Sequence, residues 1–213
     1  MQTDDLISLM TASHRPVDTG WLKRATWIAA LATLAGTVAL VLVTLGQRPD
    51  LGSAWMTLPV VAKALLGASV ATIALVLFQR SLRPGLKPAR LLPLVAIPVL
   101  LVAAGALLTL AQAPAEQWSA LVFGRYWRAC LIAVPLYALC PLVVLLIVAR
   151  SGAPMNGRLT GACAGLASAG LAAVAYSVHC PDDTMPFLAT WYTLAIVIVT
   201  GLGALAFPRL IRW

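Results

Sequence analysis

Charged residues are scarce in this sequence: they make up 10% of its 213 residues, and only seven are Asp or Glu. Soluble domains are nearer a quarter charged and about half apolar, whereas this chain is 61% hydrophobic. A soluble globular domain is therefore excluded, and the composition predicts an integral membrane protein. The formal net charge of +8 does not indicate direct nucleic-acid binding, because the basic residues of a membrane protein must first be placed relative to the bilayer.

Paired cysteine motifs are also missing. The four cysteines, Cys130, Cys140, Cys163 and Cys180, form no CxxC and no paired zinc-type spacing, which excludes the common redox and zinc motifs. The first apolar run follows an acidic, polar start rather than a basic stretch, so we predict no cleavable signal peptide.

Six long apolar runs dominate what is present. A helix needs about 20 apolar residues to cross the hydrocarbon core of a bilayer, and six stretches reach that length. They predict an all-α, polytopic bundle of six transmembrane helices with short connections. The expected spans are residues 25–45, 58–78, 91–113, 129–149, 159–178 and 187–207.

Lys and Arg are distributed unevenly between the two sides of this bundle. Eleven fall on the side of the two termini, and three, Arg48, Arg125 and Arg128, fall on the other. Because cytoplasmic segments carry the excess, we predict an N-in, C-in topology: a cytoplasmic tail (1–24), the bundle (25–207) and a cytoplasmic C-terminus (208–213). Lys63 lies inside the second span near its outer end, where its long stem is expected to reach the interface.

Small residues recur every four positions on two of the spans. Gly161, Gly165, Ala169 and Ala173 do so on the fifth span, and Ala32 and Gly36 on the first. Because this spacing lets helix backbones approach closely, we expect both stripes to be packing surfaces.

The segment SVHCPDDTMPF (177–187) places ionisable side chains between two apolar runs. Cys180 falls at the outer end of the fifth span and Cys130 at the outer end of the fourth, so two thiols share one membrane face. In a bacterium that face is the periplasm, where disulfides are permitted. His179, Asp182 and Asp183 add nitrogen and oxygen donors that suit zinc- or cadmium-like ions. These five residues are candidates for sensing an oxidant or a metal, with no resident cofactor required and a transient metal ion at this face left open.

Arg125 and Arg128 flank Cys130 on the outer side. Nearby cations lower the pKa of a thiol, and they can also attract an anion. Alternatively, one of these arginines pairs with Asp182 or Asp183 and the CPDD sequence is simply a turn. The residues alone leave both interpretations open.

The tail MQTDDLISLM predicts a short amphipathic helix. Thr3 can cap it, Asp4 and Asp5 suit its N-terminal dipole, and apolar residues form one side. A helix this short is marginal alone in water, so we expect it to order on the membrane or against a partner protein. Its apolar side consists of Leu6, Ile7, Leu9 and Met10.

Together, the TDDLISLM start, the six spans, the Cys of RYWRAC and the HCPDDTMPFLATWY segment resemble the NrsF family of bacterial inner-membrane proteins. That family negatively regulates an extracytoplasmic-function sigma factor. The resemblance implies sigma-factor binding by the tail, and heavy-metal stress sensing by Cys130 and Cys180. The tail residues concerned are Asp4, Asp5, Leu6, Ile7 and Leu9, with Met10 on the same apolar side.

The leading hypothesis is therefore a membrane-embedded anti-sigma factor, not an enzyme, that releases its sigma factor when the outer cysteines sense stress. One alternative is a membrane thiol oxidoreductase, which the lack of CxxC disfavours. Another is a small-solute or metal transporter, which should carry ionisable groups within its spans. Apart from Lys63, the expected spans carry no charged residue. The sequence does not predict the oligomeric state.

Overall fold

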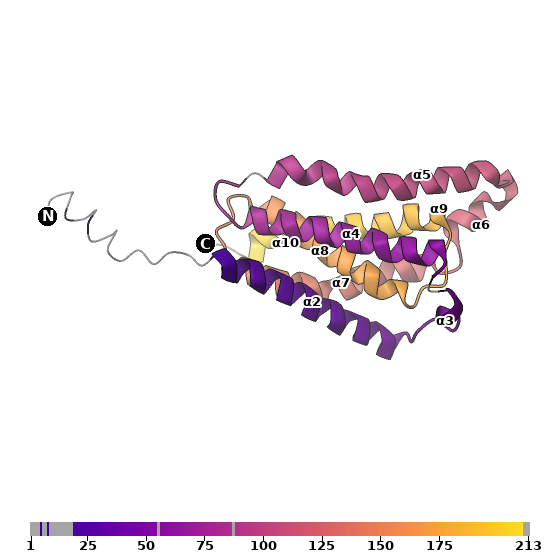
Figure 1. Ribbon diagram of the computed structural model, residues 1–213, viewed down its shortest axis with the longest axis horizontal. Coiled ribbons are helices and arrows are strands. Elements are labelled where there is room, and N and C mark those ends of the chain that lie inside the picture. Colours follow the sequence, from indigo (N-terminus) through magenta and orange to yellow (C-terminus); the bar gives the residue numbers. More distant parts are fainter. Residues whose placement is uncertain (1–4, 6–7, 9–18, 55, 87, 211–213) are drawn as a thin grey trace.

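The computed structural model describes Asp5, Ser8 and residues 19–54, 56–86 and 88–210, and all regular elements in these ranges are helical (Figure 1). η1 and η2 are 3₁₀ helices and η3 is a single turn of π-helix. The elements are α2 (Thr19–Thr44), α3 (Leu51–Ala54), α4 (Leu58–Ser81), η1 (Pro88–Val95), α5 (Ala96–Gln112), η2 (Ala115–Gln117), α6 (Trp118–Phe123), α7 (Trp127–Ala149), α8 (Gly157–Ser177), α9 (Met185–Phe187), η3 (Leu188–Tyr192) and α10 (Thr193–Leu210).

Six helical segments are long and apolar enough to cross a membrane, which confirms the predicted all-α fold with six spans. The fourth segment differs most from its expected bounds, because η2 and α6 precede α7 and are joined to it through a turn at Gly124. The six segments are Gly20–Thr44, Leu58–Ser81, Arg90–Gln112, Ala115–Ala149, Gly157–Ser177 and Met185–Leu210.

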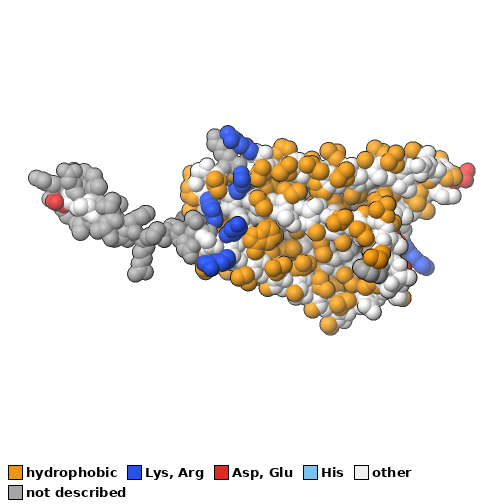
Figure 2. Space-filling model, in the orientation of Figure 1, with side chains coloured by type: hydrophobic (Ala, Val, Ile, Leu, Met, Phe, Trp, Pro, Cys, Tyr) orange, Lys and Arg blue, Asp and Glu red, His pale blue; other side chains and the backbone are white. Residues whose placement is uncertain are grey.

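The bundle has two chemically different ends. α2 begins and α10 ends at the same end, and Lys and Arg side chains gather there (Figures 1 and 2). We call it the basic end; it includes Arg80 in the last turn of α4 and Arg209 in the last turn of α10. The opposite end carries Cys130 near the start of α7 and Cys180 just after α8, and we call it the cysteine end. The N-in, C-in orientation remains a prediction.

Helix α8 lies at the centre of the bundle and is the most buried of the six segments. A Cβ atom on Gly161 would lie 2.2 Å from the Gly203 carbonyl oxygen of α10, and one on Gly170 would lie 2.7 Å from the Gly67 carbonyl oxygen of α4. Only glycine permits such close approach between helix backbones. The expected packing role of the small residues on the fifth span is therefore confirmed.

The stripe expected on the first span is different. Ala32 and Gly36 are exposed, and a Cβ on Gly36 would have nothing within 4 Å. α2 instead turns Thr33, Thr37 and Val41 inward. The four-residue spacing was a correct signal on α8 and a wrong one on α2, because spacing alone does not say which side of a helix meets a neighbour.

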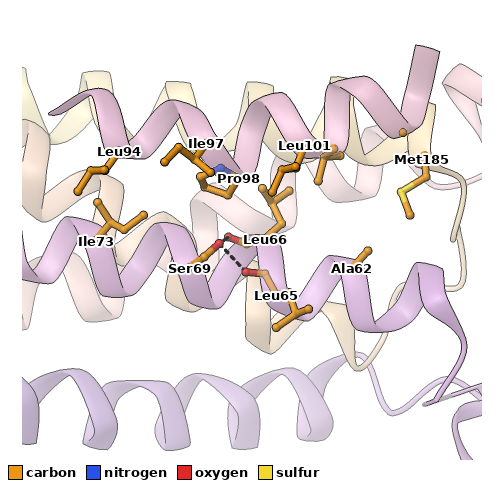
Figure 3. Close-up of a pocket in the computed structure, with 12 residues that line it drawn as sticks. Ala62, Leu65, Leu66, Ser69, Ile73, Leu94, Ile97, Pro98, Leu101 and Met185 are labelled. Atoms are coloured by element: carbon orange, nitrogen blue, oxygen red, sulfur yellow. Dashed lines mark hydrogen bonds between the residues drawn. The ribbon is translucent and has the colours of Figure 1, made fainter. Parts of the chain in front are cut away.

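A cavity of about 530 Å³ lies between α4 and α5 (Figure 3). Its lining is almost entirely apolar, with Leu66, Ile97 and Leu101 pointing into it. Among the lining residues the hydroxyl of Ser69 bonds back to its own helix, at 2.6 Å from the Leu65 carbonyl oxygen. Ligand sites use a few convergent polar groups for orientation. The candidate site therefore has to be sought elsewhere, at the cysteine end.

Candidate functional site

Cys130 and Cys180 lie in the same buried core cluster at the cysteine end, both with 0% of their surface exposed. Cys130 is in the first turn of α7, and Cys180 follows the last turn of α8. Both are free thiols. Burial raises the pKa of the Cys180 thiol and a nearby lysine opposes this only in part, so the thiol is protonated near neutral pH.

Two buried tyrosines accompany the thiols. Tyr176 of α8 and Tyr192 of η3 have ring centroids 6.3 Å apart and lie in the same buried core cluster as both cysteines. Neither hydroxyl makes a well-formed hydrogen bond to any group that the structure describes, although the Tyr192 hydroxyl lies beside the Cys180 sulfur. The π-turn of η3, which the sequence did not reveal, contains Tyr192; such turns are frequent at functional sites.

A cluster of charged side chains encloses the backbone of Cys180. The Lys63 Nζ atom donates to the carbonyl oxygen of Cys180 at 2.9 Å and to Asp183 Oδ1 at 2.5 Å. Arg48 donates to both oxygens of Asp183, at 2.9 and 2.8 Å, and to the same Cys180 carbonyl at 3.3 Å. It also forms a bidentate ion pair with Asp50, in which both nitrogen–oxygen distances are 2.7 Å. Two cations and two carboxylates thus balance each other at the cysteine end.

The position of Lys63 corrects the sequence-based expectation. Its side chain does not reach the interface but is fully buried, with 0% exposed, as α4 packs against α8. A buried ammonium group is costly unless it is paired, and the two acceptors supply that pairing. The only sign of this role in the sequence was the presence of a lysine inside an apolar span. Its acidic partner, Asp183, lies 120 residues further along the chain.

Asp182 and His179 stabilise the loop on its other side. Asp182 Oδ2 accepts hydrogen bonds from the backbone N–H groups of Arg125 and Tyr126, at 2.9 and 2.7 Å. These groups precede α7, so the carboxylate lies where the helix dipole favours negative charge. His179 Nδ1 is 3.0 Å from the carbonyl oxygen of Gly46. The loop after α8 is therefore tied to both the α2–α3 and the α6–α7 connections.

Arg125 and Arg128 do not form the predicted ion pairs with Asp182 or Asp183 among the pairs that the structure describes, and attraction of an anion stays a prediction. Both are exposed, and Arg128 stacks over the Trp127 ring, 5.1 Å from its centroid. Asp183 pairs with Arg48 and Lys63, and Asp182 with backbone amides, so the predicted Arg125 or Arg128 pairing is wrong for the ion pairs that the structure describes.

The metal interpretation is weakened by the same geometry. Within the described ranges, no three His, Cys, Asp or Glu side chains are grouped so that they could hold a metal ion. His179, Asp182 and Asp183 each have other partners. The two thiols by themselves are too few for a zinc-type site, which takes three or four protein ligands.

The other two cysteines lie away from this site. Cys163 is buried in a second core cluster nearer the basic end. Cys140 is exposed on the outside of α7. Of the predicted tail residues, Asp5 is exposed and its carbonyl accepts from the Ser8 hydroxyl at 2.9 Å. Asp4, Leu6, Ile7, Leu9 and Met10 lie outside the described residues.

Comparison with known proteins gives consistent matches. The NrsF family, described as "Negative regulator of sigma F", matches residues 10–213. The "Probable anti-sigma-F factor NrsF" of Azospira oryzae is 31% identical over 213 residues, and the "Anti-sigma-F factor NrsF" of Caulobacter vibrioides is 32% identical over 217 residues. Both alignments cover all of this chain and all of the relative. No solved structure matches.

Proposed function

We propose, on the premise that the chain belongs to the NrsF family of negative regulators of sigma F, that it is an anti-sigma factor of the bacterial inner membrane. The observation that carries this proposal is the full-length similarity to two anti-sigma-F factors, together with six helices fit to cross a membrane. The partner is a sigma factor of the extracytoplasmic-function class, held at the cytoplasmic surface.

The N-terminal tail is the proposed sigma-binding segment. It precedes α2 in the chain, and α2 begins at the basic end, which the excess of Lys and Arg predicts to be cytoplasmic. Its apolar residues Leu6, Ile7, Leu9 and Met10 would enter a groove of the sigma factor, in the manner of other amphipathic recognition helices. Asp4 and Asp5 would lie at the start of that helix, where negative charge is favourable.

Cys130 and Cys180 are the proposed sensor. Both thiols are completely buried in a densely packed region. Neither an oxidised form of the thiols nor a bound metal ion would fit there without repacking. Two changes at the thiols would act as the signal: conversion to a disulfide, with two electrons and two protons passed to an oxidant, or coordination of a soft ion. Either change would shift the bundle toward a state in which the tail releases the sigma factor. The signal is thus a local change of packing, and no catalysis is needed.

The two alternative functions receive less support. A thiol oxidoreductase needs an accessible thiol of low pKa, whereas Cys180 is buried and its pKa is raised. A transporter needs polar or ionisable groups along its pathway, whereas the cavity between α4 and α5 is apolar. Lys63 is buried but already paired with Asp183.

Capture of the sigma factor tests the proposal directly. Membranes that contain the full-length protein should retain its cognate sigma factor, and addition of a thiol oxidant or a soft metal ion should release it. A control sigma factor from an unrelated system should not be retained. If the cognate sigma factor is not retained by untreated membranes, the anti-sigma assignment is wrong.

A further inference from the structure

The charged cluster at the cysteine end has no part in the proposed binding of the sigma factor, yet it contacts the sensor segment directly. Lys63 and Arg48 both donate to the carbonyl oxygen of Cys180, at 2.9 and 3.3 Å. Both also pair with Asp183, three residues further along the same loop. The peptide of a predicted sensor residue is thereby held by two cations from different parts of the chain.

We propose that Lys63, Arg48 and Asp183 form a latch that positions Cys180 and keeps it buried. This latch rests on the proposed sensor function, and in that function its opening couples a change at Cys180 to α4 and to the α2–α3 connection. Lys63 and Arg48 are positioning residues, since they contact the backbone of Cys180 and its loop.

Because the two cations of the latch are buried, the loss of either ion pair costs much free energy. Lys63 is 0% exposed and Arg48 is 4% exposed, and an uncompensated charge at either place is strongly unfavourable. A shift of the Cys180 loop would separate Asp183 and the Cys180 carbonyl from both cations at once. The latch therefore favours one position of the loop and resists intermediate ones, as a two-state element should.

The placement of the three residues also links the site to the rest of the bundle. Lys63 lies in the second turn of α4, and α4 packs along α8 through the close Gly67–Gly170 approach. At its other end α4 reaches Arg80 at the basic end. α4 thus joins the latch to the end of the bundle at which α2 begins (Figure 1).

The test is the rate at which N-ethylmaleimide modifies each cysteine of the full-length protein in detergent, read by mass spectrometry. Lys63→Met should increase the rate at Cys180 at least about tenfold, because removal of one partner from a buried ion pair strongly destabilises it. Cys163, buried in the other core cluster, should keep its rate. Lys63→Arg, which retains a charged donor, should stay close to the unmodified sequence, and Arg128→Met provides a matched loss of an exposed cation at the same end.

Two results would overturn the latch. One is an unchanged rate at Cys180 in Lys63→Met, and the other is an equal increase at Cys180 and Cys163, which indicates general loosening. Should Lys63→Met fail to accumulate, Asp183→Asn removes the opposite charge with little change of volume and is judged by the same two outcomes.

A sigma-dependent reporter separates this inference from the proposed function. Lys63→Met at wild-type membrane abundance should activate the reporter without any stress, even when combined with Cys180→Ser. If release in the otherwise unchanged protein proves independent of Cys130 and Cys180, the sensor proposal fails while the labelling result still decides whether the latch exists.

Discussion

Gly124 leaves the space that the carboxylate of Asp182 occupies. A Cβ atom on Gly124 would lie 2.7 Å from Asp182 Oδ2, the atom that accepts hydrogen bonds from the two amides ahead of α7. The backbone of Gly124, with φ of 57° and ψ of −157°, is in a region that is essentially restricted to glycine. One glycine thus lets the loop after α8 lie against the start of α7.

Gly124→Ala should destabilise the protein by about 1 to 3 kcal/mol through backbone strain and additionally displace Asp182. Thermal unfolding in detergent measures the effect. Gly46→Ala is the matched control, because Gly46 also has a positive φ, of 77°, but its Cβ would meet nothing within 4 Å. Equal losses in the two variants would show that the contact with Asp182 contributes nothing.

Leu6→Asp or Ile7→Asp should abolish retention of the sigma factor while the bundle stays folded. A charge left unpaired in an apolar binding groove costs about 2 to 5 kcal/mol. Pull-down of the sigma factor from membranes measures the loss. Ser8→Asp adds the same charge at an exposed position and should retain binding; full retention by both apolar-side variants would place the interface elsewhere.

Cys130→Ser and Cys180→Ser should each silence stress-induced release, because a disulfide or a shared soft ion needs both thiols. Cys140→Ser and Cys163→Ser should respond normally, since Cys140 faces outward and Cys163 lies in the other core cluster. Reporter activity under metal or oxidant stress is the measurement. Normal release by the double variant at Cys130 and Cys180 would move the sensor to another part of the chain.

The orientation can be tested with exposed positions at the two ends. In a background without native cysteines, Ser53→Cys and Glu116→Cys should react with an impermeant maleimide added outside intact cells. Ser151→Cys and Met155→Cys, exposed at the basic end, should react only after the membrane is permeabilised. The opposite pattern would reverse the N-in, C-in prediction and the assignment of the cysteine end to the periplasm.

Acid should weaken the charged cluster over a defined range. The hydrogen bond from Arg48 lowers the pKa of Asp50 to about 2. Burial alone would raise the pKa of Asp183, yet the hydrogen bonds from Arg48 and Lys63 bring it below its usual value. Both carboxyl groups therefore stabilise the fold above an unfolded pKa of about 3.9, and this contribution is lost as the pH falls through the folded values.

The melting temperature in detergent should accordingly respond little to these two groups between pH 5 and 8, and should fall between about pH 4 and pH 2. Asp183→Asn should lower the melting temperature at pH 7 and flatten the acid decline. An acid profile identical in the variant and the unmodified protein would mean that the cluster does not contribute to stability in this range.

The six-helix architecture could be predicted from the sequence because its cause is local. A run of about 20 apolar residues has to form a helix across a bilayer, where no water satisfies the backbone. The expected spans accordingly match the six observed segments. The resemblance to the NrsF family, carried by TDDLISLM, RYWRAC and HCPDDTMPFLATWY, was likewise present in the residues themselves, and the family match confirms it.

Pairing between distant residues could not be predicted in the same way. Asp182 and Asp183 are adjacent in the chain, yet one caps α7 through backbone amides and the other joins Arg48 and Lys63. Nothing local distinguishes them, because the choice depends on which helix ends the packing of α4, α7 and α8 brings beside the loop. The sequence by itself determined six helices and two cysteines near one end. Only the tertiary structure decided that these thiols are buried and that a lysine inside a span is the partner of Asp183. Burial and pairing are properties of the packed bundle and not of any local stretch of sequence.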